Sequence, residues 1–445
     1  MSYKLGMVSL GCAKNQVDAE MLLAAAGQQG YTICDSVEEA DAVIVNTCGF
    51  IESAKKESID EILQLARLKE TGRLKAIVVT GCLAERYREQ IRKELPEVDA
   101  VLGIGANKDI GKALQQVLNG NKLEWFGSKY DLPLSGKRIL FTPKHYAYLK
   151  VSEGCSHKCT YCAIPLIRGK LRSRTIEDIV QEANKLAENG VKELIIIAQD
   201  TTHYGEDLYD KLMLPALLRE LCKIDGIVWI RLLYCYPNRI TDELLDVIAQ
   251  EDKVLNYIDL PLQHSVERIL KEMKRGGSAE SLTALIEKMR AQIPDIVIRT
   301  TFIAGFPGET EEEFNQMAEF SRNIRFDRMG CFAYSKEENT SAARMPNQVD
   351  EDVKQHRAKI MMEEQMNIMQ ELGEKRIGTV MQILTEGYDD DLDLYYGRSY
   401  ADSPDIDGRV TFTVSGSPPN NGDFVDVLIT DCISCDLTGK MVEGS

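Results

Sequence analysis

The sequence predicts an α/β protein of three parts: a doubly wound parallel sheet, a partial (βα)6 barrel and a small antiparallel β-barrel. The first segment alternates short apolar runs with helical patterns, and a middle segment repeats this alternation six times. Residues 373–445 instead consist of short β-patterned pieces separated by Gly, Pro, Asn and Asp. At 445 residues the chain is also too long for one ordinary core.

Composition and charge limit the possible function classes. The chain has 53 Lys+Arg against 70 Asp+Glu, a net charge of −17, which disfavours phosphate backbones and favours basic partners or small ligands. No apolar run approaches the roughly 18 residues of a membrane span, and MSYKLGMVSLGC lacks the hydrophobic core of a signal peptide. We therefore expect a cytoplasmic protein without membrane contact. In that compartment its twelve cysteines indicate metal binding or catalysis before disulfides.

Residues 1–126 are predicted to form the first domain. Three of its apolar runs, MVSLGC, DAVIVNTC and KAIVVTGC, end on a cysteine where the chain turns toward a helix. The carboxyl ends of parallel strands share one edge of a sheet, and open α/β sheets bind ligands at that edge. We therefore expect Cys12, Cys48 and Cys82 to share a metal site, the alternative being three separate core cysteines.

Residues 127–140 mix Gly, Pro and charge and are predicted to be a linker to a second domain, residues 141–372. Six βα units fall short of the eight that close a barrel, so we expect an open barrel with its chemistry at the carboxyl ends of the strands. Thr310 with Glu313 predicts a capping box, and Gly373 is expected to end the last helix in a left-handed cap. The six strand-like runs end near Ser152, Asp200, Pro237, His264, Gly308 and Ser335.

The motif CSHKCTYC, residues 155–162, follows the first barrel strand. Thiolates spaced four and three residues apart can bind three irons of one cubane cluster and leave the fourth iron open. An open iron can chelate S-adenosylmethionine (SAM) for one-electron reductive cleavage to a radical. Zinc is the alternative, but structural zinc needs four ligands and only His157 lies nearby. We therefore expect a 4Fe-4S cluster on Cys155, Cys159 and Cys162.

Together these features resemble the methylthiotransferase family of radical-SAM enzymes over essentially the whole chain. That family combines an amino-terminal domain with three cysteines, a CxxxCxxC barrel and a carboxy-terminal TRAM-type β-barrel. The resemblance implies a second, auxiliary 4Fe-4S cluster on Cys12, Cys48 and Cys82. SLGCAKNQVD, CAIPLIRGKLRSR, IIIAQDTTHYG and DLYYGRSYADSPDIDG resemble the branch that modifies a ribosomal protein. The tRNA-modifying branch typically reads nearer to GCQMN, which this chain does not match.

The resemblance also implies the reaction. It would be methylthiolation at the β-carbon of an aspartate in small-subunit ribosomal protein number twelve, free or in the ribosomal subunit. SAM would give both the radical and the methyl group, with flavodoxin or ferredoxin as an electron donor and a separate sulfur donor. Two alternatives stay open: a tRNA 2-methylthioadenosine synthase of the same family, and a non-catalytic iron–sulfur or zinc interaction scaffold.

The charge of the last segment bears on the substrate. Residues 373–445 contain 14 Asp+Glu and 5 Lys+Arg, so their net charge is 5 minus 14, or −9. A module that binds phosphates relies on Lys and Arg, so this segment is better matched to a basic ribosomal protein than to tRNA. DDDLD, residues 389–393, is its densest acidic run, and a solvated loop without a partner is the alternative for it.

Two further motifs are candidate binding elements. RGKLRSR follows the cysteine loop, and its arginines are expected to bind the carboxylate of the substrate or of SAM, a solvated surface run being the alternative. IAGFPGE, residues 303–309, provides glycines at the carboxyl end of the fifth strand, where bare backbone can approach the adenosine of SAM. The ring of Tyr161 can cover the adenine. The expected binding residues are Arg168, Arg172 and Arg174 for the substrate, and Tyr161, Gly305 and Gly308 for SAM.

Overall fold

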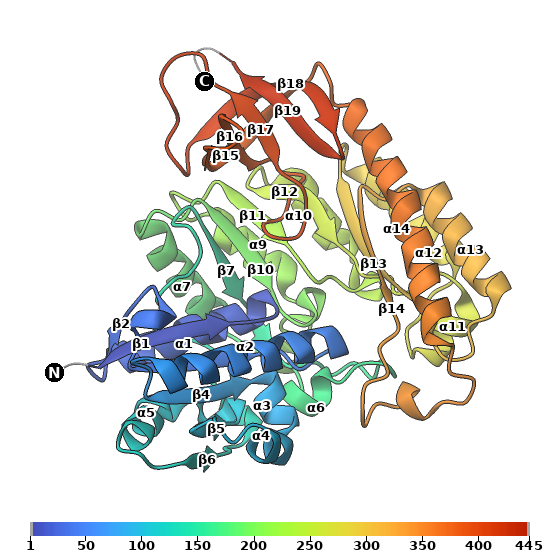
Figure 1. Ribbon diagram of the computed structural model, residues 1–445. Helices are drawn as coiled ribbons and strands as arrows, with labels where there is room; N and C mark the ends of the chain where they lie inside the picture. Colours follow the sequence, from blue (N-terminus) through green and yellow to red (C-terminus); the bar gives the residue numbers. More distant parts are fainter. Residues whose placement is uncertain (1–2, 443–445) are drawn as a thin grey trace.

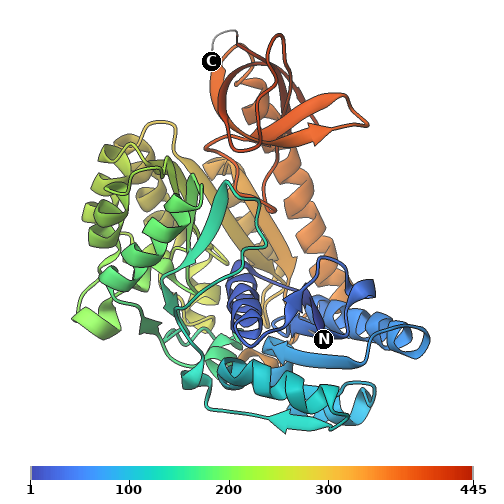
Figure 2. The ribbon, with the colours of Figure 1, turned by 90° about the vertical axis from the view of Figure 1, so that its left-hand side faces the viewer.

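The structure is a computed structural model that describes residues 3–442. A sheet of residues 4–125, a sheet of residues 146–333 and a β-barrel of residues 380–441 follow one another along the chain. The first sheet and the β-barrel lie at opposite ends of the central sheet (Figures 1 and 2). This arrangement confirms the predicted α/β fold class. Within the described part of the chain, none of the helices has the length and apolar character that a membrane crossing needs.

The amino-terminal sheet is parallel throughout, as a doubly wound fold requires. Its strands are β1 (Lys4–Ser9), β2 (Thr32–Ile33), β3 (Ala42–Thr47), β4 (Ala76–Gly81), β5 (Ala100–Leu102) and β6 (Leu123–Trp125). Its helices are α1 (Ala13–Gly27), α2 (Glu52–Thr71), α3 (Cys82–Arg86), α4 (Arg88–Glu94) and α5 (Ile110–Leu118). The strand order is β2-β1-β3-β4-β5-β6. One apolar core gathers under α1 and α5 and another under α2, α3 and α4, so helices cover both faces.

The central sheet is an open, parallel set of six strands, which confirms the predicted partial barrel. In sheet order the strands are β14 (Arg328–Ala333), β13 (Val297–Ala304), β12 (Val254–Asp259), β11 (Trp229–Leu232), β10 (Glu193–Ile197) and β7 (Tyr146–Lys150). The predicted runs end two to five residues beyond these strands. The difference arises because apolar residues such as Leu233 and Leu262 stay buried after the strand has ended.

The loops and helices after these strands follow the βα pattern. The loop after β7 carries the short ribbon β8 (Ser152–Glu153) and β9 (Arg172–Ser173), which brackets α6 (Ile164–Arg168). The remaining helices are α7 (Ile176–Glu188), α8 (Glu206–Tyr209), α9 (Leu214–Cys222), α10 (Asp242–Gln250), α11 (Glu267–Glu272), α12 (Ala279–Gln292) and α13 (Glu311–Ile324). The capping box that Thr310 and Glu313 predict is present at the start of α13.

A long helix, α14 (Glu351–Glu374), packs along β14 and leads into the β-barrel (Figure 1). The prediction that Gly373 ends this helix in a left-handed cap is wrong, because the helix continues to Glu374 and its capping residue Lys375 has a right-handed φ of −67°. A Cβ atom at Gly373 would lie 2.4 Å from the Sγ of Cys432. The glycine therefore lets the helix approach the β-barrel closely.

The carboxy-terminal barrel is closed, in the order β15-β16-β17-β19-β18. Its strands are β15 (Val380–Asp389), β16 (Leu394–Arg398), β17 (Val410–Thr413), β18 (Phe424–Ile433) and β19 (Asp436–Met441). All neighbours pair antiparallel except β17 and β19, which pair in parallel.

Residues 399–409 connect β16 to β17 and extend from the barrel onto the central sheet (Figure 1). In this docking loop Asp402 pairs with Arg328 at 2.6 Å, and Asp407 accepts a hydrogen bond of 2.6 Å from the Tyr257 hydroxyl. Arg328 is the first residue of β14, so the β-barrel docks toward the amino ends of the central strands. The carboxyl ends stay available to the amino-terminal domain.

Candidate active site

Cys12, Cys48 and Cys82, here called the first triad, lie at one edge of the amino-terminal sheet. Cys48 follows β3, Cys82 follows β4, and Cys12 precedes α1 after β1. These three strands are neighbours in the sheet. A Cβ atom at Gly11 would lie 2.9 Å from the Sγ of Cys48, and one at Gly49 would lie 3.0 Å from the carbonyl carbon of Cys82. The three loops are therefore packed against one another.

Cys155, Cys159 and Cys162, here called the second triad, share one closed loop before α6. The backbone N–H of Cys155 donates to the carbonyl of Gly169 at 3.0 Å, and that of Cys162 donates to the carbonyl of Cys159 at 3.1 Å. All three cysteines are free and partly exposed. The loop therefore holds the three thiols within eight residues, and each of them remains partly exposed.

The two triads are in contact through α6. Cys82 of the first triad forms a small apolar cluster with Ala163 and Ile167. Ala163 directly follows Cys162 of the second triad, and Ile167 lies one turn further along the chain. The Nη2 of Arg168 also lies 3.3 Å from the Sγ of Cys82. The six cysteines therefore flank one region between the amino-terminal domain and the carboxyl edge of the central sheet.

A buried ion network holds the two domains together beside the triads. The Nη1 of Arg168 lies 2.5 Å from Asp18 and 3.2 Å from Glu153, and its Nη2 donates to the side chain of Asn15 at 2.6 Å. Lys150 at the end of β7 binds the same two carboxylates. Burial raises the pKa of Glu153, but Lys150 and Arg168 outweigh this effect and lower the pKa to about 2. The network thus joins α1 of the first domain to β7 and α6 of the second.

The three arginines expected to bind substrate are instead engaged within the protein. Arg168 is 2% exposed and is shared between the carboxylates described above. Arg174 is 4% exposed and pairs with two acidic residues of α7, both at 2.7 Å. Arg172 donates to backbone carbonyls of Lys129, Tyr130 and Leu132 in the linker. All three guanidinium groups thus already have partners within the protein, and binding of the substrate by these arginines stays a prediction.

The residues expected to contact SAM lie around the second triad or beneath α14. The hydroxyl of Tyr161 accepts a hydrogen bond of 3.2 Å from Arg275, and burial raises its pKa. Gly305 has a φ of 75°, and a Cβ atom there would lie 2.1 Å from the Cγ of Lys354 in α14. Gly308 has a φ of 79°, and its N–H donates to Asn347 at 2.8 Å. Gly305 thus has a packing role, whereas a Cβ atom at Gly308 would meet only the Nη1 of Arg268, at 4.0 Å. Contact of these residues with SAM stays a prediction.

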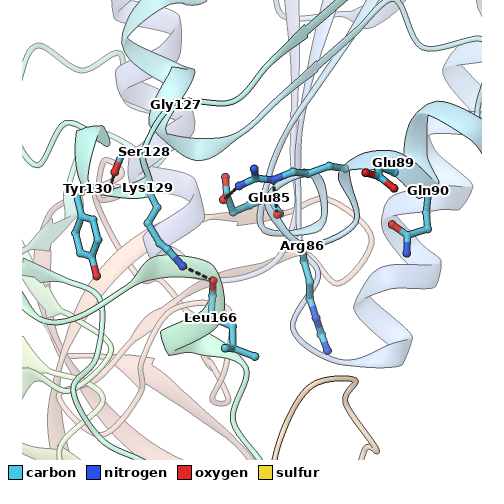
Figure 3. A pocket seen from close by; sticks show the side chains of 10 residues that line it. Glu85, Arg86, Glu89, Gln90, Gly127, Ser128, Lys129, Tyr130 and Leu166 are labelled. Carbon is cyan, nitrogen blue, oxygen red and sulfur yellow. Dashed lines mark hydrogen bonds and ion pairs between the residues drawn. The ribbon is translucent and has the colours of Figure 1, made fainter.

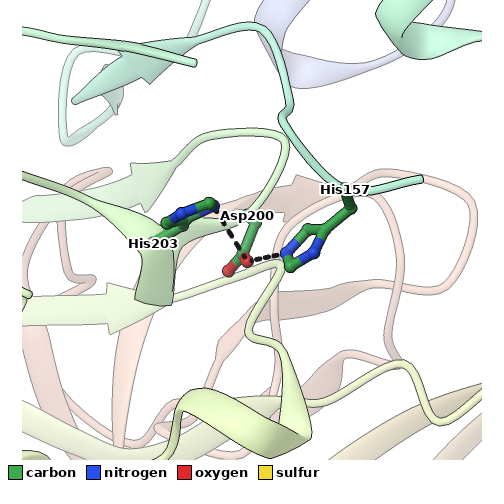
Figure 4. A group of neighbouring side chains, drawn as sticks. All are labelled: His157, Asp200 and His203. Atoms are coloured by element: carbon green, nitrogen blue, oxygen red, sulfur yellow. Dashed lines mark hydrogen bonds and ion pairs between the residues drawn. The ribbon is translucent and has the colours of Figure 1, made fainter. Parts of the chain in front are cut away.

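His157 ties the loop of the second triad to the end of β10 (Figure 4). Its Nε2 lies 2.6 Å from Asp200, and its ring stacks on Tyr236 with centroids 4.1 Å apart. On the other side of Asp200, the Nδ1 of His203 lies 4.0 Å from the same carboxylate oxygen (Figure 4). The three groups lie within 4.8 Å of one another, close enough to share a metal ion. His157 is thus hydrogen-bonded to Asp200. The zinc alternative requires the same imidazole as the fourth ligand of a zinc ion held by the second triad, which is a different role.

The thiols of the two triads differ in their electrostatic surroundings. Burial raises the pKa of Cys48 and Cys162 to about 12 and that of Cys155 to about 11. The pKa of Cys12 is lower than its ordinary value. Desolvation by the surrounding protein favours the neutral thiol even though the residue reaches solvent, but the positive charges of Lys14 and Arg168 outweigh this effect. Because the thiolate is the ligand form, binding of a metal releases protons from the buried thiols.

A surface cleft of about 490 Å³ opens beside α6 (Figure 3). Its walls come from α3, α4 and the start of the linker, and the Nζ of Lys129 donates to the carbonyl of Leu166 across it at 2.6 Å. None of the six cysteines lines this cleft. It therefore lies outside the candidate site.

Comparisons with known proteins agree with this organisation. Three family models match: the Uncharacterized protein family UPF0004 over residues 4–103, the Radical SAM superfamily over residues 149–321 and the TRAM domain over residues 377–442. A "Ribosomal protein uS12 methylthiotransferase RimO" of Clostridioides difficile is 48% identical over 99% of both chains. The protein of the same name from Pelotomaculum thermopropionicum is 49% identical over 99% of this chain and 100% of its own. The chain belongs to the RimO family.

RimO-family membership makes this protein a radical-SAM methylthiotransferase, and the Radical SAM match implies a 4Fe-4S cluster and SAM. Solved structures show the same fold at low identity. TsrM from Kitasatospora setae, a radical SAM methyltransferase, aligns with a TM-score of 0.55 at 13% identity over 74% of this chain and 73% of its own. OxsB, a cobalamin-dependent SAM radical enzyme, aligns with a TM-score of 0.50 at 12% identity over 82% of this chain and 56% of its own.

Proposed function

We propose that this protein places a methylthio group on the β-carbon of an aspartate in ribosomal protein uS12. One observation carries the proposal: the two cysteine triads meet where Cys82 packs against Ala163 and Ile167. An unactivated carbon has no acidic proton, so the groups that remove its hydrogen and deliver sulfur must converge on it. A full-length relative of 48% identity is named a ribosomal protein uS12 methylthiotransferase.

We assign the radical-generating 4Fe-4S cluster to the second triad and the auxiliary 4Fe-4S cluster to the first. The donor sets fit, since each place gathers three thiols at a loop edge, and three ligands leave one iron of a cubane open. When bound, the clusters and SAM would supply the hydrogen-abstracting radical, an open iron to hold the incoming sulfur, and the methyl group. The protein holds the thiols, keeps the triads adjacent through Arg168, and shields the region with the domain interface.

The proposed reaction needs an electron, a sulfur atom and a substrate, and each of these implies a partner. Reductive cleavage of SAM consumes an electron, so a flavodoxin or ferredoxin is the proposed electron donor, and the added sulfur atom requires a sulfur donor. Ribosomal protein uS12 is the proposed substrate, free or within the small subunit, which places the reaction in the cytoplasm.

The surface of the β-barrel supports a basic protein substrate. Asp402 and Asp407 form ion pairs with arginines of the central sheet, so their charges are not available to a substrate protein. Residues 388–393, the end of β15 and the turn that leads into β16, are here called the acidic hairpin and instead present three exposed aspartates. Opposite charge raises encounter rates and selects partners, so we propose that this hairpin meets uS12. The exposed aspartates are Asp390, Asp391 and Asp393.

The proposed reaction is tested with anaerobically reconstituted protein, reductant and SAM, offered either uS12 or tRNA. Mass spectrometry is expected to show a methylthio group on uS12, together with 5′-deoxyadenosine. Cys155→Ala should lose both products, whereas Cys82→Ala should lose the methylthio group and still form 5′-deoxyadenosine. Modification of tRNA alone would establish the tRNA synthase instead, and absence of 5′-deoxyadenosine from the native protein would leave the interaction scaffold.

The acidic hairpin is tested by replacing its three exposed aspartates with lysine. We expect uS12 to bind about tenfold more weakly at low salt and with less dependence on salt, because attraction becomes repulsion. Affinity titrations at several ionic strengths measure both effects. An unchanged affinity and salt slope would exclude the hairpin from the interface. The matched control reverses three exposed glutamates of the central domain: Glu188, Glu280 and Glu287.

A further inference from the structure

Lys14 is a buried cation without a carboxylate partner. It lies in the first turn of α1, two residues after Cys12, and is 7% exposed. Its Nζ lies 3.1 Å from the centre of the Tyr234 ring. Among residues 3–442, no carboxylate forms an ion pair with it. Burying an unpaired ammonium is costly, so the retained charge needs an explanation.

Other cations near the triads already have partners. Arg168 and Lys150 share two buried carboxylates. Arg275, beside the second triad, donates to the Tyr161 hydroxyl and to the carbonyl of Pro261. Lys14 meets Tyr234, which attracts the cation through its ring and also takes a hydrogen bond from it, and the charge of Asp259 reaches Lys14 without forming an ion pair. An ammonium has three donors, so Tyr234 leaves at least one of them unused. Its ammonium can therefore accept a further anionic partner.

Tyr234 fixes the place of this ammonium. It follows β11 at the carboxyl edge of the central sheet and has a φ of 60°, a strained conformation for a non-glycine residue. Its N–H donates to Asp259 at 3.0 Å, and its carbonyl accepts from the N–H of Thr201 at 2.9 Å. These two bonds hold the tyrosine under Lys14. The ammonium thus lies where the first-triad domain meets the sheet edge of the radical-SAM domain.

We infer that Lys14 binds the side-chain carboxylate of the aspartate that receives the methylthio group. This inference rests on the proposed function. The β-carbon must lie between the triads, and the carboxylate one bond away must then enter the same buried region. A carboxylate there needs a cation and hydrogen-bond donors, and Lys14 offers both beside Cys12. A neutral nucleobase would leave the ammonium unpaired, so Lys14 also selects an aspartate against a purine.

The test compares two peptides on the full-length, anaerobically reconstituted protein without SAM. One is a uS12 fragment that contains the target aspartate, and the other has asparagine at that position. The native protein should bind the aspartate peptide about 10- to 100-fold more tightly. Lys14→Met keeps the length of the side chain without its charge, and it should bring both peptides to the same affinity. Lys14→Arg should restore part of the preference.

The ratio of the two affinities separates recognition from damage, because a misfolded protein or a lost cluster weakens both peptides together. Lys170→Met removes an exposed lysine near the second triad and should leave the ratio native. A native ratio in Lys14→Met or in Lys14→Gln would overturn the assignment. If instead the native protein modifies tRNA and neither binds nor modifies uS12, the proposed function fails first, and the role of Lys14 fails with it.

Discussion

At the scale of single residues, burial decides the role of Arg168. Its place after the cysteine loop favours contact with substrate, yet the fold surrounds it with Asp18, Glu153 and the Sγ of Cys82. A cation in that position holds one ligand of the first triad beside the helix that follows the second. We therefore propose that Arg168 positions the two triads, whereas Lys14 is the residue inferred to bind the substrate carboxylate.

Replacing Arg168 by methionine should destabilise the metal-free protein strongly. The change leaves two buried carboxylates with Lys150 as their only cation, and breaking such a pair costs about 3–5 kcal/mol. Urea denaturation measures the free energy of unfolding. Arg172→Met, which removes bonds to backbone carbonyls and a contact with the ring of Tyr130 but no ion pair, should cost about 1 kcal/mol. Equal losses in the two variants would argue against the buried network.

At the scale of elements, the start of α13 is stabilised both by the capping box that its own sequence predicts and by a contact with another helix. Thr310 and Glu313 predict its capping box, which the structure confirms. Glu313 also binds Arg268 of α11 at 2.6 Å, a partner that the local motif does not reveal. The hydrogen bond from Arg268 lowers the pKa of Glu313 from an ordinary 4.5 to about 2.

The stabilisation from Glu313 should therefore depend on pH. Because its pKa is lower in the folded state, its contribution is complete above about pH 4.5 and is lost as the pH falls toward 2. Glu313→Gln should unfold at a lower temperature than the native protein at pH 7, and this difference should shrink at pH 4 and again at pH 3. Thermal unfolding at each pH measures it. A difference independent of pH, or the same trend in the exposed neighbour Glu312→Gln, would contradict the prediction.

Helix α14 shows the opposite case, in which a local signal misleads. Glycine near the end of a helix favours a left-handed cap, but Gly373 lies against Cys432. We expect Gly373→Ala to be destabilising, although alanine gains about 1 kcal/mol of helix propensity over glycine. In a Cys432→Ala background, where the sulfur is absent, the same change should be neutral or stabilising. Chemical denaturation of the four proteins measures the coupling, and the same Gly373 effect in both backgrounds would disprove the contact.

At the scale of the whole molecule, the β-barrel is held by its docking loop. Asp402 pairs with Arg328 and also accepts from the backbone and hydroxyl of Ser399. Trp229 in the central sheet packs edge-on against Phe424 of the β-barrel, with ring centres 4.8 Å apart. This tryptophan therefore reports whether the two parts are docked.

Asp402→Ala should release the β-barrel before the central sheet unfolds. In a Trp125→Phe background Trp229 is the one remaining tryptophan, and its emission under tryptophan-selective excitation should change at a lower urea concentration than the far-ultraviolet circular dichroism. Loss of the buried partner of Arg328 supplies the driving force, about 3–5 kcal/mol. Asp391→Ala, which changes the exposed acidic hairpin, should keep the two transitions together. Coincident transitions in Asp402→Ala would show that other contacts suffice for docking.

The order of the three parts and the two cysteine triads follow from the amino-acid sequence by itself. Strand and helix periodicities are local, and cysteines at the ends of adjacent parallel strands, or within one eight-residue loop, have little freedom to lie elsewhere. The predicted domain boundaries after residues 126, 140 and 372 are of the same local kind and stay predictions.

Only the tertiary structure decided the partners of charged and small residues. Arg168 meets Asp18, His203 approaches His157, Lys14 reaches Tyr234, and Gly373 makes room for Cys432. Each pair joins segments that are separate in the sequence, so no periodicity or spacing encodes it. The physical reason is that the cost of burying a charge, or the space for a Cβ atom, is set by whatever the rest of the chain places beside it.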